Sequence, residues 1–106
     1  MIVSTTNDLT GYRVTRHIGV VRGVTVRSRS VLGNLAGGLQ SIFGGNLSIY
    51  TDLAEHARQE AYDLMVSHAQ RAGADAVIAM RYDANEIMDG ITEVLAYGTA
   101  VKVEKL

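Results

Sequence analysis

The chain has 106 residues, of which 47% are hydrophobic and 20% are charged, values typical of a single globular domain spanning residues 1–106. A formal net charge of −1 argues against a strong overall attraction to nucleic acid or to an anionic membrane surface. Because cysteine is absent, disulfides, thiolate metal sites and cysteine nucleophiles are excluded. Neither a signal peptide nor a stretch of about 20 apolar residues is predicted, so we expect a cytoplasmic protein without a membrane partner.

The first elements expected in chain order are a short strand at the amino terminus and a long strand over residues 12–27. Apolar and polar side chains alternate along the long segment, which is typical of a half-buried strand. Gly19 and Gly23 within it predict a bend or a bulge. The residues expected on its apolar, buried face are Tyr12, Val14, Ile18, Val20, Val24 and Val26.

Residues 30–43 change to helical spacing, with Ser30 as the N-cap. Three glycines weaken this helix by roughly 1 kcal/mol each, which indicates either a close approach of another backbone or only partial helicity. No charged residue lies between Arg29 and Asp52, although a helix that faces solvent normally carries charges on its outer side. We therefore expect a second subunit to cover this segment.

A second helix is predicted over residues 52–72. Asp52 and Glu55 have the spacing of a capping box, and Gly73 follows the last turn as a C′ residue. The side chains expected to face inward are Leu53, Ala57, Ala61, Leu64, Met65, His68 and Ala72.

The carboxyl-terminal part predicts a β-hairpin. An apolar run forms a strand over residues 76–82, a turn rich in Asp and Asn extends to Gly90, and the last strand covers residues 91–104 with a bulge at Gly98. Together these elements predict an α+β fold with two helices on one face of a small antiparallel sheet. The other face of the sheet needs a cover, which again indicates association between subunits.

The histidines are the candidates for transition-metal chemistry. His56, Glu60 and Asp63 lie at positions i, i+4 and i+7 of the predicted helix, and imidazole with carboxylates suits a divalent first-row metal ion. The alternative is an ordinary solvated helix face, which produces such triplets by chance. His68 lies on the inward stripe and is interpreted as a hydrogen-bonded core or interface histidine.

The arginines of the long strand are candidates for anion binding. Arg13 and Arg27 share a face with His17 if the strand is regular, and guanidinium groups suit phosphate and carboxylate. Residues 1–51 carry a charge of +4 and residues 52–106 a charge of −5, so the alternative is pairing with the acidic helix of the same or a neighbouring chain. A nucleic-acid partner is not favoured, because no aromatic residues are interleaved with these arginines.

Catalytic motifs are not found in the sequence. The glycine pairs at residues 37–38 and 44–45 lack the Lys-Ser/Thr of a phosphate-binding loop, and no serine nucleophile motif occurs. We therefore expect a protein that is not an enzyme.

Several short segments occur in an order that identifies a resemblance. They are Ser4-Thr5-Thr6, Gly44-Gly45 five residues before Tyr50, Ala57-Arg58 with Ala61, Gly73-Ala74-Asp75-Ala76-Val77, and GITEVLAYGTAV from Gly90 to Val101. Along essentially its full length the chain resembles the YbjQ-like family of small bacterial and archaeal proteins. Better-known members have Leu four residues after the tyrosine, whereas Leu53 here follows Tyr50 by three, which suggests a subgroup.

The resemblance implies a β-α-β-β subunit that assembles into a ring-shaped homopentamer. It also implies the family label "putative heavy-metal-binding", although no thiol is present here and no ligand residue can be carried over. Our preferred hypothesis is a non-enzymatic homopentameric binding or scaffold protein of unknown ligand. The alternatives are a metal-ion-binding protein with His and carboxylate ligands, and an anion-binding or nucleotide-binding protein that uses the arginine-bearing strand.

Overall fold

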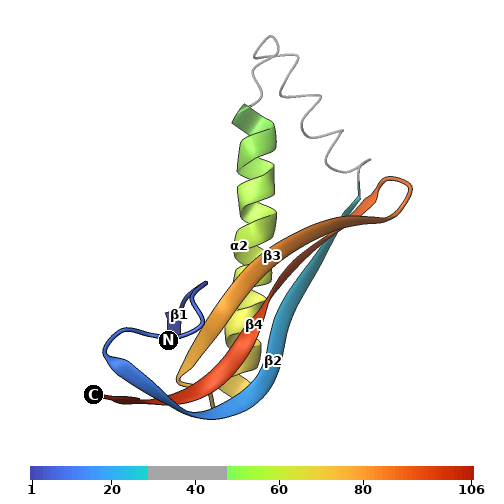
Figure 1. Cartoon of the computed structure of the whole chain (residues 1–106). Helices are drawn as coiled ribbons and strands as arrows, with labels where there is room; N and C mark the ends of the chain where they lie inside the picture. Colours follow the sequence, from blue (N-terminus) through green and yellow to red (C-terminus); the bar gives the residue numbers. More distant parts are fainter. Residues whose placement is uncertain (29–47) are drawn as a thin grey trace.

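One helix lies across one face of a four-stranded sheet in the computed structural model, which describes residues 1–28 and 48–106 (Figure 1). The elements are β1 (Ile2–Val3), β2 (Tyr12–Ser28), α2 (Ser48–Arg71), β3 (Ala76–Met88) and β4 (Ile91–Lys105). The strand order is β1-β3-β4-β2, with β1 parallel to β3 and the other pairs antiparallel. The α+β class is confirmed, but the sheet is mixed rather than antiparallel. The helix predicted over residues 30–43 lies outside the described residues.

Strand β2 is irregular in its first half. Its pairing with β4 shifts between Val14 and Arg16 and again between His17 and Gly19, so a bulge at Gly19 is confirmed. Each shift inserts one extra residue into β2 and reverses the side-chain alternation. As a result Val14 packs in a cluster on one side of the sheet, while Ile18 packs against the helix-facing core.

The predicted buried face is wrong for the second half of β2. Val21, Gly23 and Thr25 face α2 and are buried, whereas the intervening Val20 and Val24 face away from the helix and are exposed. A regular alternation from Tyr12 correctly places Val14, Val20 and Val24 on one face, but this is the face opposite α2 and not the core face. The two shifts in register cancel each other, so the prediction fails for another reason: α2 packs on the side of Val21 and Gly23, where the glycine admits the helix.

Helix α2 begins at Ser48, four residues before the predicted cap at Asp52. The helical spacing of inward-facing side chains extends to this earlier start. Tyr50 lies three residues before Leu53, and both side chains line the space between helix and sheet. The buried stripe consists of Ala57, Ala61, Met65 and Ala69. Of the side chains expected inward, Leu64 is 44% exposed and Ala72 is also exposed, whereas Ala69 belongs to the core and was not predicted.

The end of α2 is as predicted. Gly73 has a φ of 81°, a left-handed conformation that glycine adopts without the steric cost of a Cβ atom. The N–H of Ala74 donates to the carbonyl oxygen of Ala69 at 3.0 Å, which satisfies one of the last helical carbonyls. The chain then turns directly into β3.

The β3–β4 hairpin is longer than predicted. The expected turn from Asp83 to Gly90 is wrong up to Met88, because β3 continues to that residue and only Asp89 and Gly90 form the turn. The polar residues of β3 are exposed and pair in register with β4, for example Asp83 with Leu95. Cross-strand pairing thus outweighs their preference for turns. Gly90 has a φ of 78°, which suits a two-residue Asp-Gly hairpin.

A bulge lies at Gly98, as predicted, but the extra residue belongs to β3. The register shifts between Ile78 and Arg81, so that Ala79 and Met80 lie opposite Gly98. Ala79 adopts a φ of 53°, a left-handed conformation that is rare for residues other than glycine. A Cβ atom at Gly98 would lie 2.6 Å from Cγ1 of Val77, so only glycine fits there.

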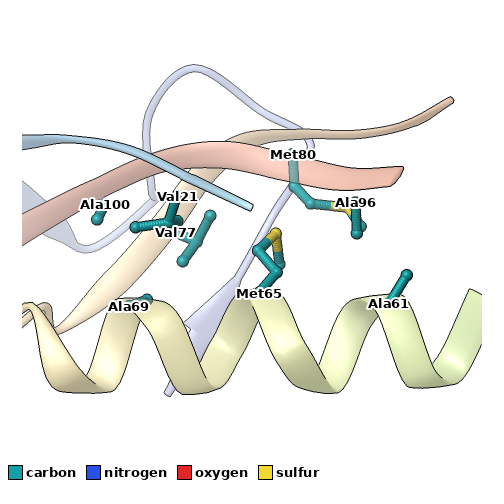
Figure 2. Packing of buried hydrophobic residues seen from close by; sticks show 8 residues of the cluster. All are labelled: Val21, Ala61, Met65, Ala69, Val77, Met80, Ala96 and Ala100. Carbon is teal, nitrogen blue, oxygen red and sulfur yellow. The ribbon is translucent and has the colours of Figure 1, made fainter. Parts of the chain in front are cut away.

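The main core lies between α2 and the sheet. Figure 2 shows Met65 directed from the helix toward the sheet, between the flanking alanines Ala61 and Ala69. Facing it are Val21, Val77, Met80, Ala96 and Ala100. A smaller cluster of Ala76, Ile78 and Val101 lies on the opposite side of the sheet under Leu9. None of the helices in the described part of the chain is long and apolar enough to cross a membrane.

Candidate functional site

The residues of the predicted metal site lie on α2, but two of them have other partners. Glu60 forms an ion pair with Arg27 of β2, and Asp63 accepts a hydrogen bond from Nε2 of Gln59 at 2.9 Å. His56 is exposed. Within residues 1–28 and 48–106, no group of three or more His, Asp or Glu side chains is arranged to hold a metal ion.

The predicted anion-binding residues are distributed along the whole of β2. Arg13 pairs with Glu104 near one end of the sheet, and Arg27 pairs with Glu60 near the other. At about 3.3 Å per residue, roughly 45 Å of strand separates the two arginines, so one small anion cannot contact both. The exposed His17 lies between the two bulges of β2. The two ion pairs also show that part of the charge asymmetry is compensated within one chain.

His68 of α2 forms a hydrogen bond with the backbone at the edge of β2. Its Nδ1 atom accepts a hydrogen bond from the backbone N–H of Arg22 at 3.2 Å. Because backbone groups point alternately to the two sides of a strand, this bond places the N–H of Arg22 on the side away from β4. The prediction of a hydrogen-bonded histidine on the inward stripe is therefore confirmed, and the helix covers one position of a sheet edge.

A cleft of about 240 Å³ lies between the first turns of α2 and the far end of the sheet. Helix and sheet diverge in this region, as Figure 1 shows, and small side chains such as Ala54, Ala57 and Ala84 leave the space between them unfilled. The lining residues are Arg27, Tyr50, Leu53, Ala54, Ala57, Arg58, Ala84, Thr92 and Val94. One signal of the cleft is present in the sequence, since Tyr50, Ala57 and Arg58 are among the residues that carry the family resemblance.

Beside the cleft, the electrostatic environment affects Tyr82. Burial raises the pKa of its hydroxyl above the ordinary value, and the nearby Tyr62 and Glu55 raise the pKa further. Arg58 opposes this shift by favouring the ionised form. Where α2 meets β3, burial and the nearby acidic groups thus outweigh Arg58 and keep the Tyr82 hydroxyl protonated.

A patch of apolar side chains lies on the face of the sheet that α2 does not cover. Val20, Val24 and Val26 of β2 are 70%, 40% and 49% exposed, and Tyr97 of β4 is 36% exposed. Leu95, opposite Val24 in the register, is half-buried. These five residues are called the outer patch below. Sequence reasoning missed it, because it assigned the three valines to the core.

Arginines border the outer patch. The register places Arg22 of β2 and Arg81 of β3 on either side of Tyr97, in one row across three strands. The guanidinium of Arg81 is held in place because Nη1 donates to the carbonyl oxygens of Thr5 and Met80, both at 2.8 Å. The face of the sheet opposite α2 thus combines exposed apolar surface with fixed positive charge.

The fold is that of a small two-layer α+β protein. The family to which the chain belongs is shown by its similarity to known proteins. The family model described as "Putative heavy-metal-binding" matches residues 1–104, so the chain belongs to this YbjQ-like family. It is 65% identical over 105 residues to a "UPF0145 protein" of Chromobacterium violaceum, covering 99% of this chain and 90% of the relative. A "UPF0145 protein" of Solibacter usitatus is 61% identical over 101 residues, covering 95% and 90% of the two chains. The predicted resemblance is confirmed.

A solved structure has the same fold. It is a protein of unknown function from Pediococcus pentosaceus, described as belonging to the DUF74 family. The two chains superpose with a TM-score of 0.57 over 98% of each, at 16% sequence identity. At this identity the similarity supports the arrangement of strands and helix, and nothing about a ligand.

Proposed function

We propose that the protein is a non-enzymatic homo-oligomer, a pentameric ring as the family resemblance implies, and that it acts as a binding or scaffold module. The observation that carries this proposal is the outer patch. A sheet face with three exposed valines and a tyrosine is costly in water, and such patches are typical of protein–protein contacts. A second copy of the chain is the partner that we propose for it.

The shape of the chain supports assembly. Its radius of gyration is 17.2 Å, whereas a compact domain of this length has a value of about 13 Å. The accessible surface of 6704 Å² likewise exceeds the roughly 5,800 Å² expected for a monomer of 11.4 kDa. A chain of this shape gains additional buried surface by packing against copies of itself.

The charges favour a head-to-tail contact. Arg22 and Arg81 border the outer patch, whereas the exposed surface of α2 carries acidic residues such as Glu55 and Asp63. Two different and complementary surfaces on one subunit join copies in a ring if the rotation closes. Within the described residues, β2 is an edge strand whose outer side offers backbone groups for the contact, although His68 already occupies the N–H of Arg22.

The proposal is tested by placing a charge in the outer patch. Val24→Asp buries a carboxylate in the proposed interface, so we expect the assembly to dissociate into folded monomers, as measured by light scattering with circular dichroism as a check of the fold. Met88→Asp is the matched control, because Met88 is an exposed apolar residue at the hairpin tip, outside the outer patch. An assembly that survives Val24→Asp, or that dissociates equally in both variants, contradicts the proposed interface.

A further inference from the structure

The cleft between α2 and the sheet is apolar in its depth and polar at its mouth. Ala57 is 5% exposed and Val94 is half-buried, whereas Ala54 and Arg58 are exposed to solvent. Ala84 of β3 forms part of the sheet side, and its single methyl group leaves room for a ligand. A ring or short acyl chain placed here would exclude water from both the helix and the sheet, which is the main driving force for binding small molecules.

Two guanidinium groups border this cleft, and they differ in how firmly they are held. Arg27 is paired with Glu60 and also donates from Nη1 to the carbonyl oxygen of Val26 at 3.2 Å. Arg58 pairs with Glu55 one turn earlier, with 3.6 Å between Nη1 and Oε1, and both side chains are more than half exposed. Because an ion pair so exposed contributes little to stability, a ligand can displace Glu55 at little cost.

We propose that this cleft binds a small organic anion with an apolar body, of the class of aromatic or short-chain carboxylates. The apolar body lies against Ala57 and Val94, and Arg58 binds the carboxylate, for which its planar guanidinium is suited. The volume of about 240 Å³ lies just below the range of about 300–1,000 Å³ found for drug-sized ligands, which favours a single small ring system. The site lies within one subunit and does not depend on the assembly proposed above.

The first experiment compares two probes of the same shape and different charge. The full chain is titrated with 2-naphthoate and with its uncharged analogue 2-naphthalenemethanol, and binding is followed by amide chemical shifts. We expect naphthoate to bind at least tenfold more tightly, with the largest shifts at Ala57, Arg58 and Val94. Equal affinity for the two probes, or no binding of naphthoate at millimolar concentration, overturns the proposal.

Variants then locate the binding site. Arg58→Gln should remove the preference for naphthoate and leave the affinity for the alcohol within twofold. Ala84→Phe fills the cleft and should weaken both probes at least tenfold, and Ala54→Phe does the same from the helix if the first variant fails to fold. Asn85→Phe is the matched control, because it places the same side chain one residue along β3, on the opposite face. Binding that survives both filling variants, or that Asn85→Phe weakens equally, overturns the assignment.

Discussion

At Gly23 the backbones of β2 and α2 approach each other closely. A Cβ atom at this position would lie 2.1 Å from the carbonyl oxygen of Ala61 and 2.4 Å from the backbone nitrogen of Met65. These neighbours are backbone atoms of a helix, so they cannot move without shifting the whole element. The glycine predicted to mark a bend or a bulge in fact lies in regular register with β4, and its role is to admit the helix.

We predict that Gly23→Ala lowers the free energy of unfolding by about 3 kcal/mol or more, because the added methyl group must displace α2 from the sheet. Urea denaturation at fixed protein concentration measures the change. The matched comparison is Gly19→Ala, whose added methyl group meets nothing within 4 Å but whose φ of 149° disfavours a side chain. Gly19→Ala should cost about 1–3 kcal/mol from backbone strain alone. A smaller cost for Gly23→Ala than for Gly19→Ala would show that the helix does not lie so close.

At the scale of elements, α2 depends on a narrow stripe in which Met65 is the only large side chain. We predict that Met65→Ala costs about 2–5 kcal/mol of unfolding free energy, because it leaves a cavity between helix and sheet. Leu64→Ala removes a similar volume at the next position, but Leu64 is 44% exposed, so its cost should be about 1 kcal/mol or less. Urea denaturation measures the loss of unfolding free energy in both variants. An equal loss in the two would refute the orientation of the helix.

The sequence predicts the elements of this fold better than it predicts their faces. Helical spacing and Gly73 identify α2 and its end, and the alternation over residues 12–27 identifies β2. The alternation groups Val20, Val24 and Val26 on one face, as observed, but β2 alone does not show which of its two faces α2 covers. For the same reason the outer patch was assigned to the core.

The candidate sites follow the same rule. The spacing correctly predicts that one helix carries His56, Glu60 and Asp63. It does not reveal that Glu60 forms an ion pair with Arg27 of β2. The cleft is also a product of tertiary structure, because it exists only where α2 separates from the sheet. Its residues come from α2 and three strands, and the only sequence signal was the resemblance at Tyr50, Ala57 and Arg58.

At the scale of the whole molecule, the chain has the features of a subunit. It is elongated, with extents of 55 × 26 × 19 Å, and its helix covers one face of the sheet while the outer patch stays exposed on the other. The charge division of +4 and −5 is compensated in part by the Arg13–Glu104 and Arg27–Glu60 pairs. The arginines beside the outer patch remain available for the head-to-tail contact that we propose.

The mass of the protein in solution tests this account most directly. Light scattering on the wild-type chain at micromolar concentration should give about 57 kDa, the mass of five copies of the 11.4 kDa chain. The same value should persist on dilution, because the apolar contact of the outer patch is expected to be stable. A folded monomer of 11.4 kDa under these conditions would contradict the central claim that the outer patch is an interface between copies of this chain.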